Sequence, residues 1–244
     1  MSTGIIIILL AIAVIVFLFF KNKSSEQNAT NTSTMTYTVE QTIPDSAVSF
    51  GYKCIWFAVK TSNQEKLIEL LKIKNVEKCN WKMGIDKAYK GSIFITPAID
   101  GWTLACGLGL PTGDSKESIK EVKKTLQTLS KEFGEAQFFC THRVVEYHCW
   151  MKAINGQVTR VYSYLGEAGE NIAIEGIPTD FEKKYKLINT FSEEAKGEKY
   201  FEDTNLVLPN EELLMQVAGH WSINPTELEN RKDLTPSIGL IGER

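Results

Sequence analysis

The sequence predicts an α+β protein with an N-terminal transmembrane helix, a flexible tether and one soluble domain whose mostly antiparallel sheet is packed by helices. Three observations support this. Residues 4–20 form an uncharged apolar run, Asn155-Gly156 joins two stretches of strand-forming residues, and residues 115–133 repeat apolar side chains at helical spacing. Strands and helices are mixed without regular βαβ alternation, which favours α+β over a parallel α/β fold.

The composition is that of an ordinary globular protein. Of 244 residues, 43% are hydrophobic and 23% charged. The net charge of −3, with no lysine- or arginine-rich stripe, argues against a nucleic-acid partner. The odd number of cysteines, mostly in apolar strand-like segments, indicates free buried thiols and a reducing compartment. They are Cys54, Cys79, Cys106, Cys140 and Cys149.

Residues 1–20 are predicted to span a membrane, because the apolar run approaches the roughly 20 residues that cross a hydrocarbon core. A cleaved signal peptide is the alternative. It is disfavoured because no basic segment precedes the run and no A-x-A-like site follows it. Lys21 and Lys23 follow the span directly, so the positive-inside rule places the domain in the cytoplasm. Residues 21–45 are rich in Ser, Thr and Asn and predict a flexible tether.

Residues 46–231 are predicted to form the soluble α+β domain and residues 232–244 a frayed C-terminal tail. Apolar runs and turn signals predict strands at 53–60, 92–96, 102–107 and 171–175. Capping patterns and helical periodicity predict helices at 62–71, 81–89, 115–133, 180–186 and 211–217, with a last short one opened by Asn224-Pro225.

Residues 136–165 predict two long strands joined by a type I′ turn at Asn155-Gly156. Pairing across that turn places one set of side chains on a core face. These are Tyr147, Cys149, Met151, Ala153, Val158, Arg160, Tyr162 and Tyr164. The opposite face, partly covered or lining a cleft, carries Glu146, His148, Trp150 and Lys152 against Leu165, Ser163, Val161 and Thr159.

Glu146 and His148 are the candidate acid–base pair, and Ser163 is expected directly across from His148. A Ser–His–Glu set activates a hydroxyl nucleophile. The alternative interpretation is a polar cross-strand network that fixes register. His142, Arg143 and Trp150 are the candidate binding residues nearby.

Neither a metal nor a cofactor is expected. In an unbroken strand His142 and His148 are about 20 Å apart, too far to share one ion. A zinc site needs three or four ligands. Residues 107–115 lack the lysine of a phosphate-binding loop, and Asp114 repels phosphate at the following helix start.

Two groups of residues resemble an uncharacterised bacterial protein family with no assigned activity. The first is Thr141-His142-Arg143-Val144 with Glu146-Tyr147-His148 and Trp150. The second is Ala218-Gly219 with Trp221-Ser222 and Pro225. The resemblance implies a bacterial source and, with the predicted span, a single-pass protein of the inner membrane.

The sequence therefore predicts a membrane-anchored protein whose domain binds a protein partner, as a regulatory or immunity-type module. The alternative function is a hydrolase-like enzyme that uses the His148/Glu146 pair. Catalysis requires these side chains to converge in an open pocket with a perturbed pKa, whereas a binding protein has them satisfied by hydrogen bonds.

Overall fold

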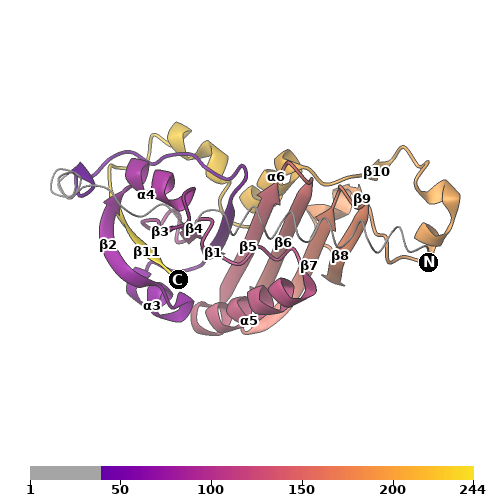
Figure 1. Cartoon of the computed structure of the whole chain (residues 1–244), viewed down its shortest axis with the longest axis horizontal. Coiled ribbons are helices and arrows are strands. Elements are labelled where there is room, and N and C mark those ends of the chain that lie inside the picture. The colour runs from indigo at the N-terminus through magenta and orange to yellow at the C-terminus, as the bar shows by residue number, and fades with distance from the viewer. Residues whose placement is uncertain (1–39) are drawn as a thin grey trace, which may run out of the picture. The chain divides into compact units, whose positions relative to one another are not determined.

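A nine-stranded sheet organises the part of the chain that the structure, a computed structural model, describes: residues 40–244 (Figure 1). Its strand order is β2-β11-β3-β4-β1-β5-β6-β7-β8, and every neighbouring pair is antiparallel. The strands are β1 (Ile55–Val59), β2 (Lys74–Asn80), β3 (Ile93–Ile95), β4 (Thr103–Cys106), β5 (Glu135–His142), β6 (Tyr147–Ile154), β7 (Gln157–Leu165), β8 (Glu170–Gly176) and β11 (Ile238–Glu243). A separate parallel pair consists of β9 (Lys186–Leu187) and β10 (Leu206–Val207).

Helices cover both faces of this sheet. The α-helices are α3 (Gln64–Leu71), α4 (Trp81–Ala88), α5 (Lys116–Phe133) and α6 (Glu211–Trp221). Short 3₁₀ helices are η1 (Glu182–Lys184), η2 (Glu194–Lys196), η3 (Glu198–Tyr200) and η4 (Pro225–Asn230). Asparagine or serine side chains cap the four α-helices by accepting backbone N–H groups: Asn63, Asn80, Ser115 and Asn210. The caps of α3 and α5 are therefore Asn63 and Ser115, where the sequence had suggested Ser62 and Asp114.

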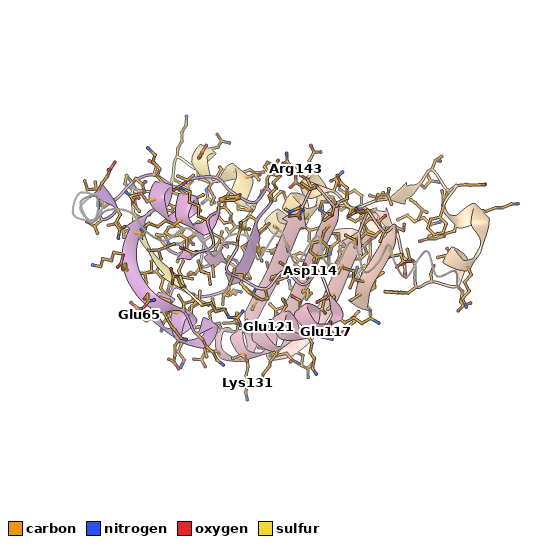
Figure 2. All side chains as sticks on the ribbon, viewed as in Figure 1. Glu65, Asp114, Glu117, Glu121, Lys131 and Arg143 are labelled. Carbon is orange, nitrogen blue, oxygen red and sulfur yellow. The ribbon has the colours of Figure 1, made fainter. Side chains whose placement is uncertain are left out.

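Two hydrophobic cores lie on opposite faces of the sheet. One packs α3 and α5 against Phe57, Phe138 and Met151. The other packs α4 and α6 against Trp56 and Trp150. Alternation along the strands produces this division, since successive side chains point to opposite faces. Figure 2 shows Glu117, Glu121 and Lys131 along α5, whose apolar side faces the sheet.

The central hairpin turns at Asn155-Gly156 as predicted, with positive φ at both residues. The predicted face is correct for β6 but wrong for most of β7. A bulge opposite Lys152 and Ala153 leaves Thr159 unpaired, and Lys152 pairs with Arg160. One extra residue moves every later side chain of the strand to the other face. Arg160, Tyr162 and Tyr164 consequently share a face with Trp150.

Residues 232–244 differ from the predicted frayed tail. They contain β11, which pairs with both β2 and β3 inside the sheet. Gly239 permits the close approach, because a Cβ there would lie 2.4 Å from the Ile95 carbonyl oxygen. Three other elements also differ from prediction. The segment 180–186 contains the 3₁₀ turn η1 and the first residue of β9 in place of the predicted helix. Helix α6 continues through Gly219 to Trp221, and β2 was not predicted.

The prediction of a single-pass membrane protein is corrected. Among the helices of residues 40–244, none is long and apolar enough to cross a membrane. The longest, α5, carries lysines and glutamates along its outer side, and α6 has only 11 residues. The predicted span at residues 1–20, and the predicted tether up to residue 39, lie outside the described residues. The supported fold class is α+β with a mostly antiparallel sheet.

Candidate functional site

The turn between β5 and β6 determines where the predicted catalytic residues lie. Residues 143–146 reverse the chain, and Glu146 adopts a φ of 48° there. The register therefore pairs Thr141 with His148 and His142 with Tyr147. The predicted single strand over residues 136–154 is wrong because it contains this turn. The turn was missed because its residues, Arg-Val-Val-Glu, include no glycine, proline or asparagine.

His148 lies at the centre of a hydrogen-bonded network. Its Nε2 is 3.2 Å from Glu146 Oε2, and its Nδ1 is 3.0 Å from Thr141 Oγ1. Thr141 Oγ1 also lies 3.4 Å from Glu211 Oε1 on α6. Arg143 completes the network by an ion pair of 2.6 Å to Glu211 Oε2. The network ties the β5–β6 turn to the start of α6.

Burial lowers the pKa of His148, although Glu146 and Glu211 act in the opposite direction. The imidazole is therefore neutral near pH 7. Thr141 Oγ1 donates to Glu211 Oε1, and the donor and acceptor roles of the two His148 nitrogens toward Thr141 and Glu146 depend on the tautomer of the ring.

A carboxylate, an imidazole and a hydroxyl in series have the chemistry that activates a nucleophile. Substrate access is the difficulty. Thr141 and His148 are buried, and Thr141, Glu146 and His148 line neither the trough beside β8 nor the cavity around Arg160 that are described below. The buried hydroxyl and imidazole are hydrogen-bonded to one another and to Glu146 and Glu211.

Ser163 is not the partner of His148. The β7 bulge pairs Ser163 with Cys149 and His148 with Tyr164. Ser163 is buried on the α5 side of the sheet, where its Oγ bonds Tyr147 Oη at 3.4 Å. The predicted Ser–His–Glu set therefore does not assemble, and Thr141 occupies the position expected for the hydroxyl.

The predicted binding residues are not brought together. His142 and Arg143 are exposed at the β5–β6 turn, where Figure 2 labels Arg143. The Arg143 guanidinium also lies over the Tyr52 ring. Trp150 is buried in the core between the sheet and α6. Its Nε1 donates to Glu182 Oε1 at 2.8 Å. Only the first two are available to a partner.

Within the described residues, no group of three or more His, Cys, Asp or Glu side chains is arranged to hold a metal ion. The five cysteines are buried and free of disulfides. Burial raises the pKa of the Cys54 and Cys149 thiols to about 12. These thiols stay protonated near neutral pH, which removes them as nucleophiles.

The sheet ends at β8 on the side of the central hairpin. No described strand pairs with the outer side of β8, which ends the strand order. Residues 171–174, Asn-Ile-Ala-Ile, contain no charge. A bulge opposite Ser163 and Tyr164 interrupts the alternation, so that the sequence neighbours Ile172 and Ala173 both line a trough against α5.

That trough, which we call the α5–β8 trough, has a volume of about 290 Å³. Its residues are Lys116, Ile119, Lys120, Lys123, Ile172, Ala173 and Glu175. Lys123 forms an ion pair of 2.6 Å with Glu175, whereas Lys116 and Lys120 form none within residues 40–244. The sequence identified these lysines only as the solvent side of an amphipathic helix. Nothing in the sequence placed them beside β8.

A scan against protein-family models, a search of curated proteins and a search of solved structures each found no match. The resemblance to an uncharacterised bacterial family therefore stays a prediction.

Proposed function

We propose that residues 40–244 form a protein-interaction module, which binds an extended acidic segment of a partner protein along β8. One observation carries the proposal: an uncharged strand edge runs beside a lysine-lined trough. An added strand gains main-chain hydrogen bonds from such an edge, and the neighbouring pockets select its side chains.

The two edges of the sheet differ in a way that supports this interpretation. At the other edge, β2 is exposed over Lys74, Glu77 and Lys78, and Asn75 adopts a φ of 51°. Charges and local distortion are common protections against unwanted strand pairing. The middle of β8 has neither charge nor proline. Thr190 Oγ1 accepts the backbone N–H of Asn171 at the start of β8, so the part of this edge proposed to accept a strand is residues 172–176.

The charge on α5 indicates the chemistry of the partner. Lys116 and Lys120 are four residues apart, a like-charge spacing that destabilises an isolated helix by about 0.2–0.5 kcal/mol. Lys116 is also the first residue of α5, where the positive end of the helix dipole disfavours a cation. Carboxylates of a bound strand would relieve both repulsions. The ordinary alternative is a solvated lysine face with no partner.

Binding is favoured over hydrolysis. The Glu146–His148–Thr141 series has the right chemical groups, but its hydroxyl and imidazole are buried within the fold. The α5–β8 trough, in contrast, is open, and its three lysines outnumber its one carboxylate, Glu175.

The test is fluorescence polarisation with a labelled peptide of about nine residues, within the usual strand length, that alternates valine and glutamate. We expect it to bind the full chain in competition with unlabelled peptide, and a valine–lysine counterpart not to bind. Lys120→Glu should weaken binding about tenfold, because attraction becomes repulsion at the interface. Lys124→Glu, the same charge change one turn along α5 but outside the trough, is the matched control and should stay within about twofold.

Ile172→Lys should abolish binding without unfolding the domain, because a charge on an edge strand blocks strand addition. Equal affinity for the acidic and basic peptides would contradict the proposal. So would equal effects of Lys120→Glu and Lys124→Glu.

A further inference from the structure

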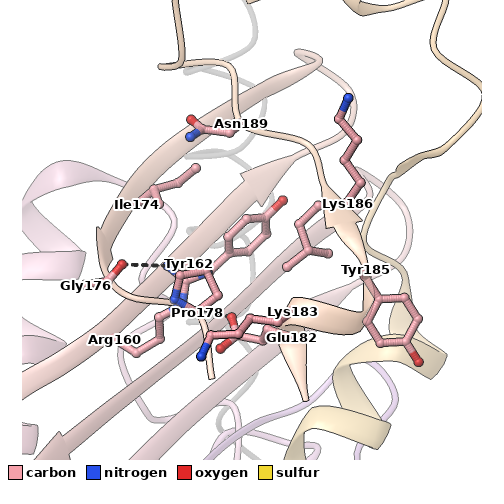
Figure 3. Close-up of a pocket in the computed structure, with 11 residues that line it drawn as sticks. Arg160, Tyr162, Ile174, Gly176, Pro178, Glu182, Lys183, Tyr185, Lys186 and Asn189 are labelled. Atoms are coloured by element: carbon pink, nitrogen blue, oxygen red, sulfur yellow. Dashed lines mark hydrogen bonds and ion pairs between the residues drawn. The ribbon is translucent and has the colours of Figure 1, made fainter. Parts of the chain in front are cut away.

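A second cavity lies on the opposite side of β8 from the α5–β8 trough. It has a volume of about 300 Å³, at the small end of ligand sites, and lies between β7, β8 and residues 178–189 (Figure 3). Tyr162, Ile174, Pro178 and Leu187 supply apolar surface. Arg160, Lys183 and Lys186 supply positive charge. We call it the Arg160 cavity.

Arg160 is a buried cation with an incomplete set of partners. Its Nε donates to Glu182 Oε1 at 2.8 Å, and its Nη1 lies 3.3–3.4 Å from the carbonyl oxygens of Val161, Glu175 and Gly176. Its Nη2 donates no hydrogen bond within the described residues. A guanidinium has five N–H donors, and two of them are on Nη2.

The unpaired Nη2 has access to solvent, although Arg160 as a whole is only 2% exposed. Among the described residues, one side-chain nitrogen or oxygen, Trp56 Nε1, is both inaccessible to solvent and without a hydrogen-bond partner. Arg160 Nη2 has no partner either but does not meet the first condition. Nη2 is therefore not sealed from solvent, and Arg160 is one of the residues that line the cavity. A charged donor in such a place is a binding point for an anion, because charge-assisted hydrogen bonds are about twice as strong as neutral ones.

The lysines at this cavity can be released from their present partners. Lys183 pairs with Asp180, whose side chain is 98% exposed, and Lys186 pairs with Asp203. The exposed Lys183–Asp180 pair contributes little, so an anion in the cavity competes readily for Lys183. Asp203 is 25% exposed and also accepts from Asn205, so an anion shares Lys186 with it. The two carboxylates belong to neither the wall nor the floor of the cavity.

Glu182 restricts the charge of the ligand. Its carboxylate is buried and lies 2.8 Å from Arg160 Nε, so this ion pair has no net charge. A doubly charged phosphate would bring two further negative charges close to Glu182 at low dielectric. A singly charged carboxylate avoids most of that repulsion. The Tyr162 ring, which stacks on Trp150 at 4.5 Å, and Ile174 suit a small apolar or aromatic body.

We propose that the Arg160 cavity binds a small organic monocarboxylate, with Nη2 of Arg160 as the central donor, Lys183 and Lys186 at the rim, and Tyr162 and Ile174 against the apolar body. This site has no lining residue in common with the α5–β8 trough, so the two proposals are tested independently.

Isothermal titration calorimetry on the full chain tests the site, with benzoate as the probe. Phenylphosphate is the doubly charged comparator and benzyl alcohol the neutral one, all at constant ionic strength. We expect benzoate to bind at least about tenfold more tightly than benzyl alcohol, as one charge-assisted hydrogen bond predicts, and more tightly than phenylphosphate.

Variants locate the binding. Ile174→Trp fills the cavity from a partly exposed position on β8 and should abolish benzoate binding while leaving the circular dichroism spectrum unchanged. Lys186→Gln should weaken binding about threefold to tenfold by removing a rim charge. The matched control, Lys196→Gln, removes an exposed lysine that pairs with Glu193 away from the cavity and should bind benzoate like the wild type. No benzoate binding, undiminished binding by folded Ile174→Trp, or tighter binding of phenylphosphate would overturn the proposal.

Discussion

Replacing Glu182 by alanine should strongly destabilise the domain, because this carboxylate joins residues 177–188 to the sheet. Its Oε1 accepts from Trp150 Nε1 and Arg160 Nε, both at 2.8 Å. Its Oε2 accepts from the backbone N and the Oγ1 of Thr179, also at 2.8 Å each. The Glu182 side chain is 0% exposed and that of Arg160 is 3% exposed.

The magnitude follows from what the substitution leaves behind. Removing one partner of a buried ion pair typically costs about 3–5 kcal/mol, because the remaining charge is uncompensated. Trp150 and Thr179 would also lose their acceptor. The Arg160 cavity moderates the loss by admitting water to Nη2, so we expect roughly 3–4 kcal/mol. A typical domain has about 5–15 kcal/mol of stability, so the variant should fold but be markedly weakened.

Urea unfolding followed by tryptophan fluorescence measures this loss. Arg160→Leu combined with Glu182→Ala should be more stable than Glu182→Ala alone, since it removes the unpaired cation. Glu193→Ala, which breaks an exposed ion pair with Lys196, is the control and should unfold like the wild type. A loss below about 1 kcal/mol for Glu182→Ala would refute the reasoning, because that is the range of an exposed pair.

Three further predictions concern the network, the hairpin and the last strand. The pKa of His148 is lowered in the fold, so the unfolded chain takes up the proton first as pH falls. Stability in urea should therefore decrease as pH falls below about 6.5, and His148→Gln should show a shallower decrease; an unchanged slope would contradict this. Gly156→Val should cost about 1–3 kcal/mol, because φ there is +81°, and an unchanged melting temperature would count against the turn. Gly239→Val should cost about 1–3 kcal/mol or more, because its Cβ would meet the Ile95 carbonyl; a frayed tail would tolerate the change.

Local signals in the sequence were sufficient for most elements. The apolar run that became β1, the amphipathic repeat of α5 and the Asn155-Gly156 turn each depend on contacts within a few residues. The faces of β6 followed from simple alternation. These features need no knowledge of distant neighbours.

Features that depend on tertiary partners were not predicted. The bulge at Thr159 depends on the pairing of β7 with β6, and no residue near Thr159 predicts a bulge from the sequence. Val144 and Val145 favoured a strand, yet the chain turns at them. β11 lies in the sheet only because β2 and β3 accept it on either side. The candidate sites have the same origin. Arg160 meets Glu182 because of the bulge, and the α5 lysines lie beside β8 because of the fold.

Amide hydrogen exchange of β8 tests the central claim most directly. In the free protein, the β8 amides that point away from β7 should exchange quickly, since no described strand protects them, except that of Asn171, which donates to Thr190 Oγ1. Saturation with the valine–glutamate peptide should slow exchange at alternate residues of Glu170–Gly176, the pattern of an added antiparallel or parallel strand. Unchanged exchange along β8, or protection confined to another part of the domain, would contradict the proposal that this edge binds a partner.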